Sequence, residues 1–418
     1  MQRWMSAAVL VLTIGQQALG AEWRDFRGPT TQGLSDAKRL PTHWSETENV
    51  VWKTEIPGLG WSTPVLTGNR LYITTAVPEA NEAQSLRIVC VDQKTGAVLF
   101  NNELFRTESK VEMHKKNSHA SASALIDDGR VYVHFGPHGT AAIDLEGKVL
   151  WKCNELTYLP QHGIGGSPAL AGDRLIICCD GHDTQYVAAL DKLTGSVLWK
   201  TPRDLGFSKG FSFGTPLVVE INGKPQAICP GSGAIVSYDP ANGKELWRVR
   251  HGNWSVVPRP VYAGGLIIAC TGYEKGKIVA IDPTGTGDVT DTHVKWSLDR
   301  GIPYNPSPVV VGDDVYFIAD AGIITCADVK TGQVHYAERV GGKFSASPLY
   351  ADGRIYVQDE EGRSIVFKPG HTFEKVAENE FANGLRTYAS HVPVDGGLIL
   401  RSESHLYRVG EKGNVAAR

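Results

Sequence analysis

The sequence of 418 residues predicts an all-β protein, an eight-bladed β-propeller in which each blade is a four-stranded antiparallel sheet. Short apolar runs rich in Val, Ile and Tyr alternate with Gly and Asp turns, which is typical of β-meanders. Several runs end in Asp, turn through Gly and reach an aromatic residue four positions later, and self-similarity at roughly 40 to 50 residues indicates a repeat architecture. Sheets that are apolar on both faces are buried when neighbouring blades cover them in a ring. The copies are Asp92/Gly96/Phe100, Asp144/Gly147/Trp151, Asp191/Gly195/Trp199, Asp239/Gly243/Trp247 and Asp328/Gly332/Tyr336.

Residues 1–20 have the features of a signal peptide. Arg3 supplies a positive charge, residues 7–14 form a short apolar core, and Ala18 and Gly20 are small residues at the expected cleavage positions. The core is too short to cross a bilayer and no longer apolar run follows, so we expect no membrane span. No Cys near the cleavage positions offers a lipid anchor. We therefore expect an exported protein, either periplasmic or extracellular.

Residues 21–49 are predicted to form an irregular N-terminal arm, packed on one face, ahead of the propeller at residues 50–418. Residues 50–56 resemble the last strand of the repeats, as in residues 149–152 and 197–200. The last repeat supplies too few runs for four strands before the chain ends. We therefore predict that the strand at residues 50–56 completes the last blade and closes the ring.

Each repeat opens with Ser-Pro or a related pair and continues with an apolar run and a Gly/Asp turn. In the repeat that opens at Pro308, four short runs are separated by tight turns, as in an antiparallel meander. A worn copy between Asp282 and Trp296 carries an insertion rich in Gly, Thr and Asp. The Asp and Gly residues are expected to form turns and the aromatic residue to pack between blades, so none of them is assigned to catalysis. The eight openings are placed at Pro64, Ser123, Pro168, Pro216, Pro260, Pro308, Pro348 and Pro393.

The repeat resembles that of the pyrroloquinoline quinone (PQQ) enzymes over about residues 50–410. Residues 187–200, VAALDKLTGSVLWK, are the clearest copy. This family contains quinoprotein alcohol dehydrogenases, the propeller subunit of the outer-membrane barrel-assembly machine, and exported propeller proteins of unestablished role. Residues 23–29 are similar to the start of the last group. The resemblance implies the propeller fold and leaves the activity open.

The resemblance also implies what a PQQ enzyme would need. In such enzymes a vicinal disulfide and a Trp lie on opposite faces of PQQ, carboxylate and amide ligands hold Ca²⁺, and an Asp acts as base. Cys178 and Cys179 resemble the disulfide motif and are the candidate cofactor-binding residues. They end the second strand of a blade, no calcium set matches, and no Cys-x-x-Cys-His haem segment is present. We therefore expect no cofactor and keep PQQ with Ca²⁺ as an alternative. No His, Cys or carboxylate spacing predicts a metal site.

The loops just before the inner strands, here called the mouth loops, carry the candidate ligand-binding residues. Each of them offers an aromatic or imidazole ring, with polar groups close by. Such rings stack on a sugar or a planar quinone while the polar groups bind its oxygen atoms. The alternative is that the rings plug the channel. The candidates are Trp61, His119, His162, Phe211, Trp254, Arg259, Tyr304, Asn305, Phe344 and Tyr388, and the catalytic residues are unknown.

Charge and composition restrict the function further. The net charge is -3 and no long run has one sign, which argues against nucleic acid as a partner. We predict an exported, monomeric, non-catalytic propeller that binds a protein or a glycan at one channel face. The alternatives are a PQQ-dependent alcohol or sugar dehydrogenase and a subunit of an outer-membrane protein assembly complex.

Overall fold

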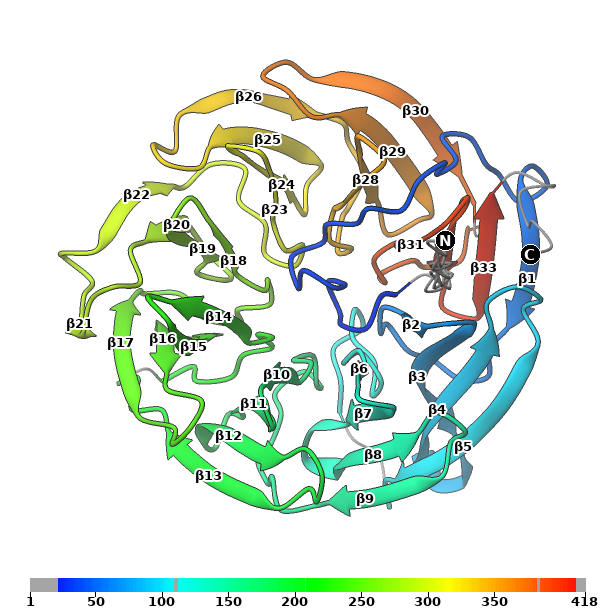
Figure 1. The fold of residues 1–418 in the computed structure, drawn as a ribbon, viewed down its shortest axis with the longest axis horizontal. Coiled ribbons are helices and arrows are strands. Elements are labelled where there is room, and N and C mark those ends of the chain that lie inside the picture. Colours follow the sequence, from blue (N-terminus) through cyan, green and yellow to red (C-terminus); the bar gives the residue numbers. More distant parts are fainter. Residues whose placement is uncertain (1–21, 109–111, 207, 382–383, 411–418) are drawn as a thin grey trace, which may run out of the picture.

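The computed structural model describes residues 22–108, 112–206, 208–381 and 384–410, and the predicted signal peptide lies outside them. Eight antiparallel sheets surround a central axis, which confirms the predicted eight-bladed propeller (Figure 1). The helical elements described are two 3₁₀ turns, η1 (Ala80–Glu82) and η2 (Gly136–His138). None of the helices in the described residues has the length and apolar character needed to cross a membrane.

Each blade contains four strands, numbered along the chain from the channel to the rim. In blades 1 to 4 the strands are β2 (Val65–Thr67), β3 (Arg70–Pro78), β4 (Gln84–Asp92) and β5 (Val98–Arg106); β6 (Leu125–Asp127), β7 (Arg130–His134), β8 (Thr140–Asp144) and β9 (Val149–Cys153); β10 (Ala169–Ala171), β11 (Arg174–Asp180), β12 (Gln185–Asp191) and β13 (Val197–Pro202); β14 (Leu217–Ile221), β15 (Lys224–Gly231), β16 (Ala234–Tyr238) and β17 (Glu245–Arg250). In blades 5 to 8 they are β18 (Val261–Ala263), β19 (Leu266–Cys270), β20 (Ile278–Ile281) and β22 (Val294–Leu298); β23 (Val309–Val311), β24 (Asp314–Ala319), β25 (Ile323–Asp328) and β26 (Val334–Arg339); β27 (Leu349–Ala351), β28 (Arg354–Gln358), β29 (Arg363–Lys368) and β30 (Glu374–Glu380); β31 (Val392–Val394), β32 (Gly397–Arg401), β33 (His405–Gly410) and β1 (Val50–Glu55).

Blade 8 joins the two ends of the propeller. β1 pairs antiparallel with β33, with Thr54 opposite Leu406, so the predicted closing strand is confirmed. The opening of this blade was placed two residues too late in the sequence. Pro393 lies inside β31, and Ser390 and His391 occupy the place of the usual Ser-Pro pair.

The Asp, Gly and aromatic residues of the repeat act across the boundary between blades. The Asp191 carboxylate accepts hydrogen bonds from the backbone of Leu193 (2.9 Å) and Thr194 (2.8 Å), and the Thr194 bond in particular holds the pKa of Asp191 below its usual value. This turn faces the preceding blade, where the Trp151 indole donates to the Lys192 carbonyl at 3.0 Å. The ring of Trp151 also covers Gly195, whose φ is +75°. Each aromatic residue of this kind therefore packs on the turn of the next blade.

Blade 5 carries the worn copy, and blade 4 compensates for it. The insertion forms β21 (Gly287–Asp288), which adds a fifth, parallel strand to blade 4 beside β17. Trp247 of β17 does not reach a Gly turn in blade 5 and instead donates a hydrogen bond to Gln226 of its own blade at 2.9 Å.

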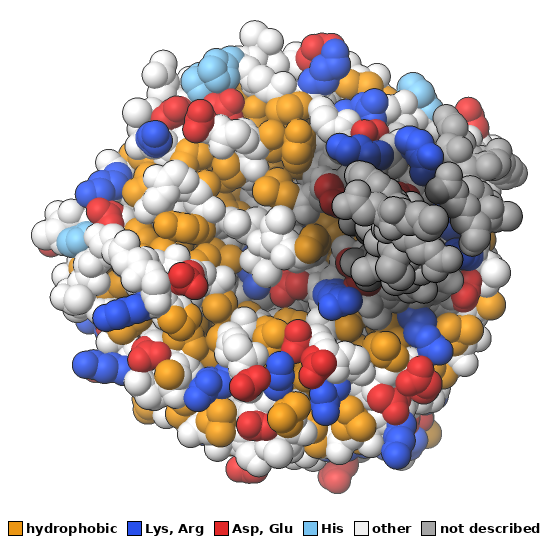
Figure 2. Space-filling model, viewed as in Figure 1, with side chains coloured by type: hydrophobic (Ala, Val, Ile, Leu, Met, Phe, Trp, Pro, Cys, Tyr) orange, Lys and Arg blue, Asp and Glu red, His pale blue; other side chains and the backbone are white. Residues whose placement is uncertain are grey.

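The N-terminal arm, residues 22–49, lies across one face of the ring. Figure 1 shows it in dark blue, crossing the centre and then running outward to β1. Trp23 and Leu66 exchange two backbone hydrogen bonds (2.9 and 2.8 Å), and Tyr350 bonds to Gly33 at 2.9 Å. Both partners lie in strands next to the turn between the first and second strands of a blade. The arm therefore covers the end of the channel opposite the mouth loops. Figure 2 shows this face, where acidic and basic side chains are mixed around the rim.

Candidate functional site

A cavity of about 520 Å³ occupies the channel on the side of the mouth loops. Its floor includes Phe26 of the arm, so the arm covers the inner end of the cavity. Most of its wall consists of flat side chains with polar groups between them. The rings that line it are Phe26, Trp61, His114, His162, Phe211, Phe213, Trp254, Tyr273, Tyr304 and Tyr388.

The structure brings most of the predicted site residues together. Trp61, His162, Phe211, Trp254, Tyr304, Asn305 and Tyr388 all line the cavity.

Three predicted residues are not among the described residues that line the cavity. His119 is buried in a turn, and burial lowers its pKa. Phe344 is fully buried in the core between blades 6 and 7. Arg259 lies beneath the cavity, where it binds the arm.

The position of a residue in its mouth loop explains this division. The lining residues recur two positions before the Ser, Thr or Arg that opens each blade, because alternate side chains of an extended segment face the same side. Phe344 lies three positions before Ser347 and so faces the core. His119 lies in a turn that breaks the alternation. The residues at this position, two before the opening residue, are Trp61, Ser121, Gly165, Phe213, Val257, Asn305, Ser345 and Tyr388.

Sequence reasoning missed several rings of the cavity. Phe213 occupies the position two before Thr215 and could have been found by that spacing. Tyr273 comes from the loop between the second and third strands of blade 5, which opens on the same side as the mouth loops; its side chain is 53% exposed. His114 lies further up the mouth loop of blade 2, and Phe26 comes from the arm, where no repeat predicts its place.

The rings hold one another in place around the mouth. Trp61 and Tyr388 lie 4.6 Å apart between ring centroids, and Arg386 lies 5.3 Å from the Trp61 ring. On the other side Tyr273 contacts Tyr304 edge-to-face at 5.4 Å. Edge-to-face pairs of this kind are a preferred aromatic geometry. The wall is therefore pre-arranged rather than formed only when a ligand enters.

A ring of hydroxyl groups, here called the hydroxyl ring, supports the wall. The first residue of a blade accepts, through its side-chain oxygen, a hydrogen bond from the backbone N–H of the same position in the preceding blade. The distances run from 2.8 to 3.2 Å. These bonds explain the Ser of the Ser-Pro openings as a joint between blades. The hydroxyl ring consists of Thr63, Ser123, Ser167, Thr215, Ser307, Ser347 and Ser390.

In blade 5 the hydroxyl ring is interrupted by Arg259. Its guanidinium donates to the Pro216 carbonyl at 3.0 Å and forms a buried ion pair with Asp25 of the arm. Asp25 also accepts the backbone N–H of Arg27 at 3.0 Å. Burial, and then the charge of Arg259, lowers the pKa of Arg27 to about 9. The substitution of Arg for a hydroxyl thus creates the anchor that holds Phe26 beneath the cavity.

Two carboxylates supply fixed polar groups at the cavity. Asp320 accepts backbone N–H groups of Tyr304 (2.8 Å) and Asn305 (3.2 Å), and burial raises its pKa above the usual value. Glu360 pairs with Lys116 at 2.7 Å. Burial opposes the charge of Lys116, but Glu360 outweighs this effect and holds the pKa of Lys116 above its usual value. These groups are placed to bind hydroxyl groups of a ligand.

Cys178 and Cys179 lie in β11, away from the cavity. Successive residues of a strand point to opposite faces. Accordingly, Cys179 packs in the core between blades 2 and 3 and Cys178 against the core between blades 3 and 4. Both are free thiols and neither lines the cavity. The described cavity residues therefore do not fit the PQQ arrangement that the resemblance implies, and we derive no step through that cofactor.

Comparison with known proteins agrees with this geometry. The profile of the PQQ-repeat family described as outer membrane protein assembly factor BamB matches residues 42–202, 183–334 and 293–404. BamB of Yersinia pestis is 25% identical over 321 residues, which are 67% of this chain and 76% of that protein.

Solved structures share the fold at low identity. BamB from Moraxella catarrhalis superposes with a TM-score of 0.56 at 12% identity, over 87% of this chain and 99% of that one. Quinohemoprotein alcohol dehydrogenase from Comamonas testosteroni gives a TM-score of 0.66 at 13% identity, over 95% of this chain and 82% of that one. Because the family profile covers most of the sequence, the chain belongs to the PQQ-repeat β-propeller family described as outer membrane protein assembly factor BamB.

Proposed function

We propose that the protein is an exported, monomeric, non-catalytic propeller that binds a glycan in the cavity. The observation that carries this proposal is a cavity of about 520 Å³, covered at its inner end and walled by aromatic rings with fixed hydrogen-bonding groups between them. This volume lies within the range of roughly 300 to 1,000 Å³ of small-molecule sites.

The chemistry of the wall favours a sugar. The faces of aromatic rings pack on the apolar C–H faces of sugar rings, and the hydroxyl groups of a sugar need donors and acceptors around its edge. Trp254 and Tyr273 supply the first, and Asp320 and Glu360 supply the second. A folded protein could contact the mouth, but its surface could not enter a cavity of this size.

Glycan-array screening followed by calorimetry with the best glycan tests the proposal. We expect Tyr273→Ala and Trp254→Ala each to weaken binding about threefold to tenfold, because a stacked ring contributes about 0.5 to 1.5 kcal/mol. Leu193→Ala is the matched control, since Leu193 is 51% exposed on the rim turn of blade 3. Equal binding by wild type and both cavity variants would count against the cavity as the site.

A protein partner in an outer-membrane assembly complex is a second candidate, supported by the 25% identity to BamB. The mouth would then be a docking surface. Here the test is co-purification with barrel-assembly proteins from an envelope extract, with Tyr273→Ala expected to reduce capture and Leu193→Ala to preserve it. Capture that ignores Tyr273→Ala would place such a partner elsewhere on the propeller.

Oxidation chemistry is tested separately. Purified protein mixed with PQQ and Ca²⁺ is expected to show no new visible absorption band and no dye-linked alcohol oxidation, because the cavity does not fit that cofactor. A band accompanied by oxidation would overturn the non-catalytic proposal.

A further inference from the structure

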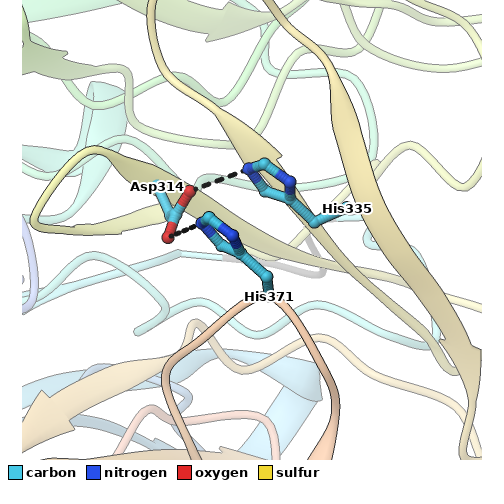
Figure 3. A group of neighbouring side chains, drawn as sticks. All are labelled: Asp314, His335 and His371. Carbon is cyan, nitrogen blue, oxygen red and sulfur yellow. Dashed lines mark ion pairs between the residues drawn. The ribbon is translucent and has the colours of Figure 1, made fainter.

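Three side chains from two adjacent blades converge at the outer part of the propeller, well away from the cavity (Figure 3). Asp314 is the first residue of β24 and His335 lies in β26, both in blade 6. His371 lies in blade 7, in the segment between β29 and β30. The sequence predicted no metal site because other strands separate the three residues along the chain.

The geometry of this group suits a small cation. One nitrogen or oxygen atom from each residue lies within 4.8 Å of the others. Asp314 Oδ1 is 3.1 Å from His335 Nε2, and Asp314 Oδ2 is 3.3 Å from His371 Nε2. Two ligands of a tetrahedral Zn²⁺ ion at about 2.0 Å are separated by about 3.3 Å. The observed spacing is therefore that of ligands around one ion.

The group is poorly satisfied by hydrogen bonds alone. His335 Nε2 is buried and has no hydrogen-bond partner, although the Asp314 carboxylate is close to it. The two imidazoles are stacked, with 3.7 Å between ring centroids and an interplanar angle of 12°. Protonating both rings to pair with Asp314 would place two positive charges face to face. A cation bound between neutral imidazoles and the carboxylate satisfies all three groups.

Contacts between the blades hold His371 in place. The backbone N–H of Gly370 donates to the Tyr316 hydroxyl of blade 6 at 2.8 Å. On the other side of His371, the Phe373 ring contacts Tyr336 of blade 6 at 6.0 Å. The segment that carries His371 is therefore fixed on both sides by blade 6.

We propose that Asp314, His335 and His371 form a binding site for a divalent transition metal, of which Zn²⁺ is the type, that clamps blade 7 to blade 6. Two imidazoles and one carboxylate suit Zn²⁺ and its first-row neighbours better than Mg²⁺ or Ca²⁺, which prefer oxygen ligands. The His371 side chain is 65% exposed, so a fourth position for water faces solvent.

The test uses the full mature chain without a histidine tag, stripped of metal by a chelator. Titration with Co²⁺ is followed by visible absorption, and Zn²⁺ is then added to displace it. We expect one site per chain, and affinity at least about tenfold lower in His371→Ala and Asp314→Asn, as for losses around metal sites. His182→Ala, which removes an exposed histidine elsewhere, is expected to bind like wild type.

The clamp is tested on the same samples by hydrogen exchange. Zn²⁺ is expected to slow exchange in residues 369–373 of wild type and not of His371→Ala. Unchanged Co²⁺ binding in His371→Ala would overturn the site, and metal binding without slower exchange in this segment would overturn the clamp.

Discussion

The glycine of each repeat turn is required by the blade before it. A Cβ atom on Gly195 would lie 2.4 Å from Cε3 of Trp151, and Gly96 stands in the same relation to Trp52. The sequence predicted that Asp and Gly form a turn and that the aromatic residue fills the space between blades. It did not predict that these two parts meet, because the pairing depends on how one blade is rotated against the next.

Two glycine substitutions separate the backbone from the packing effect. Gly195→Ala is expected to destabilise the protein by about 1 to 3 kcal/mol more than Gly172→Ala, because overpacking adds to the cost of a left-handed backbone. Gly172 is the matched control, since it also has a positive φ (+59°) but no atom within 4 Å of an added Cβ. Urea unfolding measures both free energies. Equal losses would show that the contact with Trp151 contributes nothing.

The arm is the element that gives the channel a closed end. Its backbone pairs with strands of blades 1 and 7, and its Asp25 reaches the one Arg in the hydroxyl ring position. The sequence predicted an arm on one face but not its path, because residues 22–49 have neither helical nor strand periodicity. The repeat makes strands predictable and says nothing of a segment outside it.

Breaking the anchor should release the arm. Asp25→Asn leaves the buried Arg259 unpaired, and removal of one partner of a buried pair costs about 3 to 5 kcal/mol. We expect faster hydrogen exchange across residues 22–35 in this variant. Glu22→Gln breaks the more exposed pair with Arg24 and is expected to change the exchange little, because such pairs contribute about 1 kcal/mol or less. Similar exchange in both variants would mean that Asp25 does not hold the arm.

The whole propeller was predictable because one repeat recurs around it, whereas the cavity was only partly so. Trp61 and Tyr388 were found because each is the ring nearest to its inner strand and also faces the channel. Phe344 satisfies the first condition and not the second, because it is one position out of step with the lining residues. Phe26 and Tyr273 come from segments that the repeat does not order.

Ring closure by β1 makes the eight blades depend on one another. Deleting residues 50–56 removes the strand beside β33 and also Trp52, whose indole donates to the Gln93 carbonyl of blade 1 at 3.0 Å. We expect the truncated chain to lose the cooperative melting transition of the whole ring. A synthetic peptide of the deleted sequence should restore it in part. A soluble truncation with an unchanged transition would contradict closure by this strand.

With Phe26 and the arm beneath it, the space inside the ring is a cup and not a tunnel. A long polymer cannot be threaded through it, so only a chain terminus can enter, and the ligand leaves by the way it came. For a fixed mass of glycan, the amount bound would then follow the number of chain ends, and shortening the polymer would increase it.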